Sequence, residues 1–187
     1  ATLAAAYVVF HHLEPTRQEV SFRTRSGLLG VRREGEILTL DFPTRAPVPA
    51  EPPEGIADAL GLVPEQVLVT PMDWMVVYGS EEDVRVLQPD KEMILTFDRP
   101  YVIATAPGDQ HDFVSRFFAP SVGVDEDPVT GSAHCVLTPY WAKRLEKNVL
   151  HAAQVSENGG ELFCELRGDR VGIGGRVEPF LEAAIDL

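Results

Sequence analysis

The sequence predicts an α+β fold in which each half of the chain contributes one hydrophobic helix followed by several strands. Residues 1–12 read ATLAAAYVVFHH and residues 128–145 read PVTGSAHCVLTPYWAKRL, and both segments are rich in apolar side chains. Runs in which apolar and polar residues alternate follow each helix, and glycine-containing turns separate them. We find no sequence repeat, yet the two halves share this plan.

The first half begins with a segment that has almost no polar atoms, so we expect a helix over residues 1–12 that is buried on all sides. Alternation predicts strands over residues 19–27 and 34–43. Five prolines then fall within residues 43–53, which marks an extended linker. The remaining elements are expected to be a short helix, two strands and a helix capped by Ser80, at residues 56–62, 66–71, 74–79 and 80–90.

The second half shows the same order of elements around its own hydrophobic helix. We expect the helix over residues 128–145, with Pro128 near its first position. Strands are expected on both sides of it, at residues 101–108, 111–120, 149–157, 160–168 and 169–187. The boundary is placed at the segment 87–100, so that residues 1–90 form one lobe and residues 91–187 the other.

The composition excludes several classes of function. The chain has 29 acidic and 16 basic residues and a net charge of −13, which argues against nucleic acid or an anionic membrane as a partner. It has only two cysteines, and these are expected to be thiols in a reducing cytoplasm. No run of 18 apolar residues predicts a membrane-spanning helix. The apolar start has no basic flank or cleavage signature, so it is not typical of a signal peptide.

The segment DEDPVTGSAH, residues 125–134, is the strongest candidate for a binding or catalytic site. The start of a helix presents unpaired backbone N–H groups and a partial positive charge. Gly131 would let a ligand approach the backbone, while Thr130 and Ser132 add hydroxyl groups. We therefore expect a site for a carboxylate or oxyanion that needs no basic side chain. Asp127, just outside the helix, could then move a proton on the bound molecule.

A purely structural interpretation of this segment stays open at this stage, because aspartate at a helix start is an ordinary N-cap. The run of three acids that ends at Asp127 favours a site. His134 is either a site residue or a packed, hydrogen-bonded core residue. Cys135 lies in an apolar helical run and is expected in the core.

No cofactor or metal ion is predicted. The five histidines and two cysteines show no spacing typical of a metal site. GIGG at residues 172–175 does not fit the dinucleotide fingerprint, and the sequence has no phosphate-binding lysine loop and no nucleophile elbow.

Four stretches carry a resemblance to a known family. DFVSRFFAP followed by GVDEDPVTGSAHCVLTPYWAKRL, then QVSENGGELFCEL, then GDRVGIGGRV, closely resemble the phenazine-biosynthesis PhzF-like proteins. The resemblance covers nearly the whole chain. It implies a two-lobed fold similar to that of diaminopimelate epimerase, in which each lobe is a β-barrel-like sheet around a central hydrophobic helix. The active site would lie between the lobes.

The resemblance also implies a chemistry, namely cofactor-free isomerisation of a small cyclic hydroxy acid by proton transfer. Asp127 matches the active-site aspartate of the family, and Gly131 and Ser132 match its substrate-contacting glycine and serine. Diaminopimelate epimerases instead use two cysteines. Asp127 occupies roughly the place of one of them and Cys135 lies farther into the helix, so racemisation by a thiol pair is disfavoured.

One part of the family pattern has no counterpart in these residues. The principal acid/base glutamate and a Gly-His pair precede the first helix in the family, whereas this sequence starts at Ala1. We therefore expect a first lobe without its first strands, whose open edge a second subunit would cover in a homodimer. Two interpretations follow: an isomerase for a small anionic metabolite that is inactive as this chain, or a catalytically silent module of the same fold that binds a small molecule or protein.

Overall fold

The computed structural model describes residues 2–24, 27–181 and 183. The chain divides into two compact units, each of which packs mainly against itself. Unit 1 combines Ala1–Asp41 with Gly174–Leu187, and unit 2 is Phe42–Ile173.

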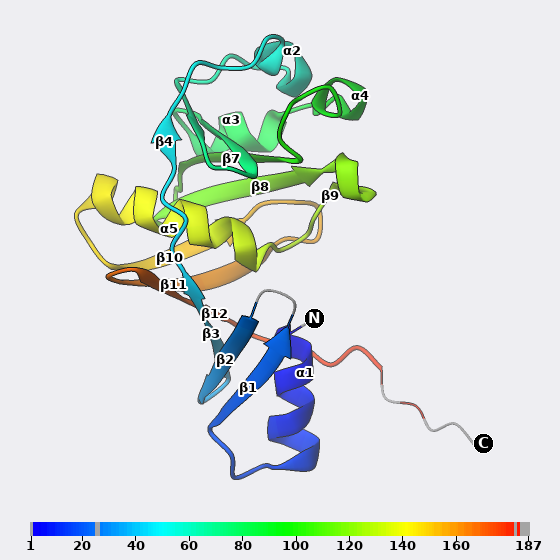
Figure 1. Cartoon of the computed structure of the whole chain (residues 1–187), viewed down its shortest axis with the longest axis vertical. Helices are drawn as coiled ribbons and strands as arrows, with labels where there is room; N and C mark the ends of the chain where they lie inside the picture. The colour runs from blue at the N-terminus through cyan, green and yellow to red at the C-terminus, as the bar shows by residue number, and fades with distance from the viewer. Residues whose placement is uncertain (1, 25–26, 182, 184–187) are drawn as a thin grey trace. The chain divides into compact units, whose positions relative to one another are not determined.

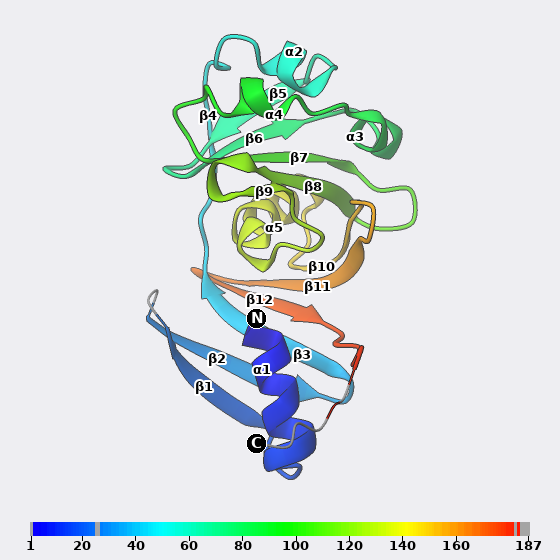
Figure 2. The ribbon, with the colours of Figure 1, turned by 90° about the vertical axis from the view of Figure 1, so that its right-hand side faces the viewer.

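Unit 1 contains a helix and an antiparallel ribbon. Helix α1 (Thr2–Val8) continues into a π-helical turn (Val9–Leu13), and strands β1 (Glu19–Thr24), β2 (Gly27–Glu34) and β3 (Ile37–Pro43) follow. β2 pairs with β1 on one side and with β3 on the other, both antiparallel. Figure 2 shows α1 lying along this ribbon.

Burial of the first helix differs from the expectation. Ala6 and Phe10 are fully buried, but Val8 is 46 % exposed and Ala4 and Ala5 are also exposed. The helix rests with one side on the ribbon, where Arg33 donates to the Phe10 carbonyl at 3.1 Å. An apolar composition therefore did not translate into burial on all sides, because the ribbon covers only the side on which Ala6 and Phe10 lie.

Unit 2 is built on one long sheet (Figure 1). Its strands run in the order β12-β11-β10-β8-β7-β6-β5-β4, and β9 pairs with β8. From β11 to β4, and between β8 and β9, neighbours are antiparallel except at β6–β7 and β8–β10. The strands are β4 (Val48–Pro49), β5 (Gln66–Val69), β6 (Asp73–Val77), β7 (Tyr101–Pro107), β8 (Phe113–Ala119), β9 (Val124–Glu126), β10 (Val149–Gln154), β11 (Gly160–Arg167) and β12 (Arg170–Gly175).

Helix α5 (Gly131–Leu145) forms the centre of unit 2, as predicted for the second hydrophobic helix. Figure 2 shows it nearly end-on, with β8 on one side and β10 and β11 on the other. Trp141 is fully buried, stacks on Phe113 with ring centroids 5.6 Å apart, and donates from its indole nitrogen to the Thr105 hydroxyl at 3.0 Å. These contacts fix the rotation of α5 within the sheet.

A second core lies where three short helices pack on the sheet. These are α2 (Ile56–Leu60), α3 (Glu81–Val86) and α4 (Lys91–Ile94), and they bury Leu60, Val84 and Ile94 among others. Ser80 caps α3 in a capping box with Asp83, which confirms the N-cap predicted there.

The segment at residues 87–100 does not separate the two units. It carries α4, and strands β6 and β7 on either side of it are paired, with Trp74 opposite Val102. The boundaries between the units fall instead at residues 41/42 and 173/174. Prolines and charged residues predicted a linker here, but a connecting segment within one unit can have the same composition as a linker between two.

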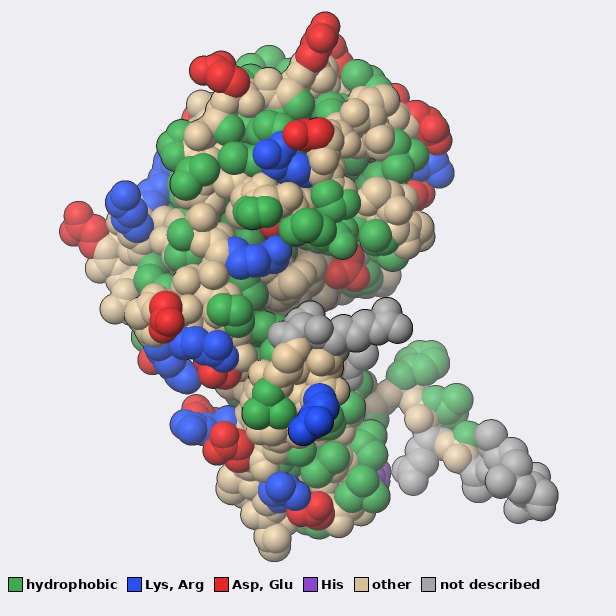
Figure 3. Space-filling model, viewed as in Figure 1, with side chains coloured by type: hydrophobic (Ala, Val, Ile, Leu, Met, Phe, Trp, Pro, Cys, Tyr) green, Lys and Arg blue, Asp and Glu red, His purple; other side chains and the backbone are tan. Residues whose placement is uncertain are grey.

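The described part of the molecule contains no helix that is both long and apolar enough to cross a membrane. On the face shown in Figure 3, Lys and Arg side chains are spread among acidic and hydrophobic ones and do not gather in one patch.

Both cysteines should resist modification in the folded protein. Cys135 and Cys164 are free thiols, 3 % and 1 % exposed. Burial raises the pKa of Cys135 to about 11 and that of Cys164 to about 12, so neither forms the reactive thiolate near neutral pH. We expect dithiobis(nitrobenzoic acid) to react with neither thiol of the native protein at pH 8 and with both thiols in denaturing urea, as measured by the release of thionitrobenzoate. A rapid reaction of one thiol in the native protein would contradict this burial.

Candidate active site

The loop between β9 and α5 carries the predicted catalytic residue. Asp127 is half-buried, and its backbone N–H donates to the Phe117 carbonyl at 3.0 Å, which extends the pairing of β9 with β8 by one residue. One carboxylate oxygen of Asp127 accepts a hydrogen bond from the Thr130 hydroxyl. Thr130, not Asp127, occupies the N-cap position of α5. The interpretation of Asp127 as an ordinary N-cap is therefore wrong.

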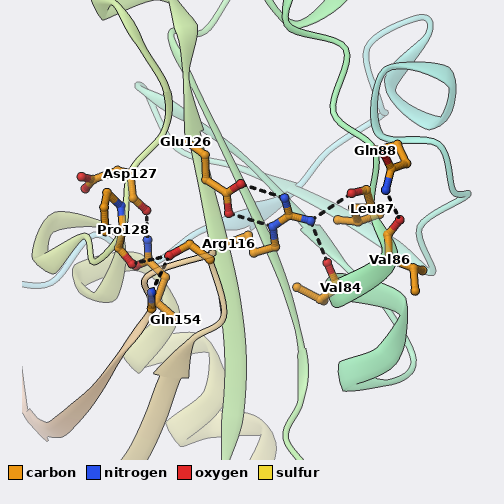
Figure 4. A network of polar contacts seen from close by, with 11 residues as sticks. Val84, Val86, Leu87, Gln88, Arg116, Glu126, Asp127, Pro128 and Gln154 are labelled. Carbon is orange, nitrogen blue, oxygen red and sulfur yellow. Dashed lines mark hydrogen bonds and ion pairs between the residues drawn. The ribbon is translucent and has the colours of Figure 1, made fainter.

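Gln154, at the end of β10, holds this loop in place (Figure 4). Its side-chain oxygen accepts from the Thr130 N–H at 2.8 Å, and its amide nitrogen donates to the Asp127 carbonyl at 2.6 Å. Gln154 is 1 % exposed, so these bonds are shielded from water. They keep residues 127–130 out of the helix. Consequently α5 begins at Gly131, three residues after the start that was expected at Pro128.

The acid that precedes Asp127 is structural. Glu126 on β9 accepts two hydrogen bonds from Arg116 on β8, at 2.8 and 2.7 Å. Arg116 also donates to the carbonyls of Val84 and Leu87, at 3.2 and 3.0 Å (Figure 4). This bidentate pair fastens β9 to β8 and to the end of α3, and so places the residue that follows Glu126.

The three consecutive acids therefore do not form one site. Asp125 is exposed and pairs with Lys91 at 3.3 Å on the surface, where such a pair contributes little stability. Glu126 is engaged by Arg116. Of the three, it is Asp127 that lies at the entrance to α5, next to Thr130. The run of three acids favoured a shared site in the sequence, but in the structure each acid has a different partner.

The first turn of α5 has the properties expected of an anion site. Gly131 is half-buried and Ser132 is exposed. Apart from its chain neighbours and the adjacent backbone of α5, no atom of the described residues lies within 4 Å of the position that a Cβ at Gly131 would occupy, so a ligand can approach the backbone there. The first N–H groups of a helix have no acceptor within the helix and lie at the positive end of its dipole. A carboxylate held by these amides would be close to Asp127 in the chain and in space.

Sequence reasoning missed a basic residue beside this turn. Arg45 donates to the Ser132 carbonyl at 2.5 Å and to the buried carboxylate of Asp73 at 3.2 Å. Its own backbone N–H bonds the Cys135 carbonyl. Because Arg45 lies in the proline-rich segment, 87 residues before Ser132, no local pattern could have linked it to α5. The anion site thus has a guanidinium nearby, although none was expected.

His134 proves to be a core residue. It is completely buried, its Nδ1 lies 2.8 Å from the Thr130 carbonyl, and its Nε2 has no partner within the described part of the chain. Burial lowers its pKa from 6.5 to about 4. Its ring also packs against Phe113, with centroids 5.8 Å apart. These features support the packed, neutral histidine rather than a proton-transfer residue.

The Gln154 contacts predict a loss of stability on substitution. Gln154→Leu keeps the size of the side chain but leaves the buried Thr130 N–H without its acceptor. One buried unsatisfied group costs about 1–3 kcal/mol, so we expect a decrease of that size in the free energy of unfolding, measured in urea. Ser121→Ala removes an exposed hydrogen bond to the Pro100 carbonyl and serves as the control, with a smaller expected loss. Equal effects of the two substitutions would contradict the assigned role of Gln154.

The buried imidazole predicts a pH dependence of stability. Because the folded-state pKa of His134 is about 4 and the ordinary value is 6.5, only the unfolded chain binds this proton between those values. Stability is therefore complete above pH 6.5 and falls as the pH decreases towards 4. We expect the native protein to lose about 2 kcal/mol more than His134→Asn between pH 7.5 and 5, measured by urea unfolding. Parallel curves for the two proteins would disprove this contribution.

Comparison with known proteins identifies the family. The family model described as "Phenazine biosynthesis-like protein" matches residues 1–176. An uncharacterised isomerase of Pseudomonas aeruginosa is 51 % identical over 175 residues, which are 94 % of this chain and 67 % of the relative. An uncharacterised isomerase of Halalkalibacterium halodurans is 38 % identical over 192 residues, covering all of this chain and 72 % of the relative.

Solved structures confirm the fold. A PhzF-family protein of Enterococcus faecalis superimposes with a TM-score of 0.90 at 41 % identity, over 94 % of this chain and 68 % of that one. A PhzC/PhzF protein of Clostridium difficile gives 0.92 at 38 % identity, over 100 % and 72 %. The α+β, diaminopimelate epimerase-like class expected from the resemblance is thereby confirmed. With a family model that spans 176 residues and relatives of this similarity, the chain belongs to the PhzC-PhzF family of phenazine biosynthesis-like proteins.

Proposed function

We propose that this protein is a cofactor-independent isomerase that transfers a proton on a small carboxylate-bearing metabolite. The family relatives named above as isomerases support the reaction class. Such a reaction needs a group that holds the substrate anion and an acid or base within hydrogen-bond reach of the transferred proton. The entrance to α5 offers both.

The observation that carries the proposal is the position of Asp127. Its carboxylate is half-buried at the start of α5 and is oriented by the Thr130 hydroxyl. The Asp127 backbone is fixed on both sides, by the Phe117 carbonyl and by Gln154. A carboxylate that is held this firmly can present its second oxygen to a bound molecule with little loss of conformational entropy.

The three residues expected to bind substrate divide into two roles. The backbone of Gly131 and the N–H and hydroxyl of Ser132 lie on the accessible side of the first turn and would hold the anionic group. Thr130 is 7 % exposed, and its hydroxyl is committed to Asp127. Thr130 is therefore assigned to positioning the carboxylate rather than to contacting the substrate.

The second candidate function is a silent binding module of the same fold. It is favoured by the acid/base groups at the α5 entrance, because Asp127 is the one such group that the described contacts bring to the anion site. Glu126 is bound by Arg116, and His134 is buried in the core. We propose that the 187-residue chain binds a small carboxylate and exchanges protons with it slowly or not at all. A homodimer in the cytoplasm remains part of the proposal for the protein.

Two measurements on the same samples separate binding from turnover. Small carboxylates that carry a hydrogen on the carbon atom adjacent to the carboxyl group are added to ¹⁵N-labelled protein. The NMR signals of the Gly131 and Ser132 amides are then followed. We expect these two amides to shift most. Ser132→Ala should weaken binding by about 0.5–3 kcal/mol, the range for one hydrogen bond that depends on charge. Shifts confined to other regions would show that the anion does not bind at α5.

Proton transfer is tested by incubation of the same carboxylates in D₂O with NMR detection of the label. The 187-residue chain is expected to incorporate little deuterium. In the full-length homologue from Pseudomonas aeruginosa, replacing the residue that aligns with Asp127 by asparagine should slow incorporation by about 10²–10⁴-fold. The matched control is the same replacement at the position that aligns with Asp125, and it should have no effect because Asp125 of this chain is exposed and pairs with Lys91 on the surface. Normal exchange in the aspartate variant would exclude an acid/base role.

A further inference from the structure

Two histidines and a glutamate meet on the sheet of unit 2, away from the entrance to α5. His111 lies in the turn before β8, His151 on β10 and Glu161 on β11. One ligand atom from each residue can be chosen so that all three lie within 4.8 Å of one another. The residues are far apart in the sequence, so their spacing gave no indication of a metal site. Their meeting is a product of the order β11-β10-β8.

The strand pairing explains why the three side chains share a face. His151 is opposite Phe163 in the antiparallel β10–β11 pair, and Glu161 is two residues from Phe163 on the same face of β11. On the other side, β10 is parallel to β8. Asp112 joins the two segments, since its N–H donates to the His151 carbonyl and its carboxylate accepts from the His151 N–H, both at 2.7 Å.

The turn that carries His111 is also fixed. A Cβ on Gly108 would lie 2.6 Å from the His111 carbonyl oxygen, so glycine is required for the backbone to close here. The two imidazole rings meet edge to face with centroids 4.7 Å apart, and the His151 ring stacks on Phe163 at 4.8 Å. The donor groups are therefore held by the fold and need not be gathered by a ligand.

Two distances between donor atoms of the cluster are close to those between ligands of one metal ion. His111 Nε2 lies 3.5 Å from Glu161 Oε1, and His151 Nε2 lies 3.6 Å from Glu161 Oε2. Both are long for hydrogen bonds between such groups. Ligands bound to zinc at about 2.0–2.2 Å in a tetrahedron are separated by roughly 3.3–3.6 Å.

The polar contacts of His151 also favour a metal site. Its Nε2 is buried and has no hydrogen-bond partner in the described part of the chain, although the side chain as a whole is 40 % exposed. A buried ring nitrogen without a partner is costly unless something binds it. A metal ion between the rings and Glu161 would satisfy this nitrogen.

We propose that His111, His151 and Glu161 form a binding site for a divalent transition-metal ion, with zinc as the ion that fits the donor set best. Imidazole and carboxylate are ordinary zinc ligands, and three protein ligands leave a fourth position for water. The partly exposed side chains, 20 % for His111 and 48 % for Glu161, allow water to reach that position. The ion would cross-link the start of β8 to β10 and β11.

Two further carboxylates lie next to the histidines, and each is paired with a basic residue. Glu81 accepts the Asp109 N–H at 2.9 Å and lies close enough to His111 for the two to interact electrostatically. Asp112 brings a second carboxylate next to His151, although Lys147 pairs with it at 2.5 Å. The chain as a whole carries a net charge of −13. Arg85 pairs with Glu81 at 2.5 Å, as Lys147 does with Asp112, so each of these outer carboxylates is partly neutralised and the ligand Glu161 supplies the carboxylate of the site itself.

The test is direct titration of the metal-free 187-residue chain with ZnCl₂ by isothermal calorimetry, together with thermal unfolding with and without zinc. We expect one site per chain and a higher melting temperature with zinc. His151→Asn and Glu161→Gln should each weaken binding at least about tenfold, since even outer-shell substitutions commonly cost 10–100-fold. Circular dichroism of the metal-free variants checks that they are folded.

The matched control is the double substitution His11→Asn with His12→Asn, which removes the exposed histidine pair of unit 1. This control should bind zinc as the native chain does. Loss of binding in the control with retention in Glu161→Gln and His151→Asn would overturn the proposal, as would the absence of binding at millimolar zinc. Because the readout is metal binding, the result does not depend on whether the protein is an isomerase.

Discussion

Burial of α5 inside the curved sheet of unit 2 is the constraint on which the rest of the unit depends. Trp141, Leu137 and Val136 are fully buried, and each large apolar side chain taken from water contributes about 1.5–3 kcal/mol. The sheet must curve for this burial, and the parallel pairing of β8 with β10 brings strands on both sides of the helix into one layer. The helix entrance is consequently surrounded by strand ends.

Polar side chains at this entrance form hydrogen bonds with backbone groups that are buried. Gln154 bonds the Thr130 N–H and the Asp127 carbonyl because a loop that enters a buried helix has no water to serve these groups. Arg116 does the same for the carbonyls at the end of α3 while it holds Glu126. Structural demands thus occupy most of the polar groups around α5. Asp127, Gly131 and Ser132 stay accessible to a ligand.

The same strand order has a second consequence on the sheet. Placing β8 beside β10 and β11 brings His111, His151 and Glu161 together, although β8 precedes α5 and the other two strands follow it. The entrance to α5 and this histidine–glutamate cluster share the strand β10, which carries both Gln154 and His151.

Local pattern was enough to determine several features of this protein. The apolar helix that became α5, the strands that became β7 and β8 and the Ser80 cap all rest on side chains close in sequence. Such features depend on period and on capping, which neighbours along the chain decide. The family, too, was recognised from contiguous motifs and confirmed by comparison.

Only the tertiary structure decided the features that depend on partners distant in the sequence. Helix α5 was expected to start at Pro128 but starts at Gly131, because the side chain of Gln154, 24 residues after Thr130, accepts the hydrogen bond of the Thr130 N–H. The three adjacent acids differ in role because their partners differ. Asp125 pairs with Lys91, Glu126 pairs with Arg116, and Asp127 accepts a hydrogen bond from Thr130. Arg45 beside Ser132, the burial of only one side of α1, and the meeting of His111 with His151 and Glu161 follow from how strands pair, and strand order is a property of the whole chain rather than of any segment.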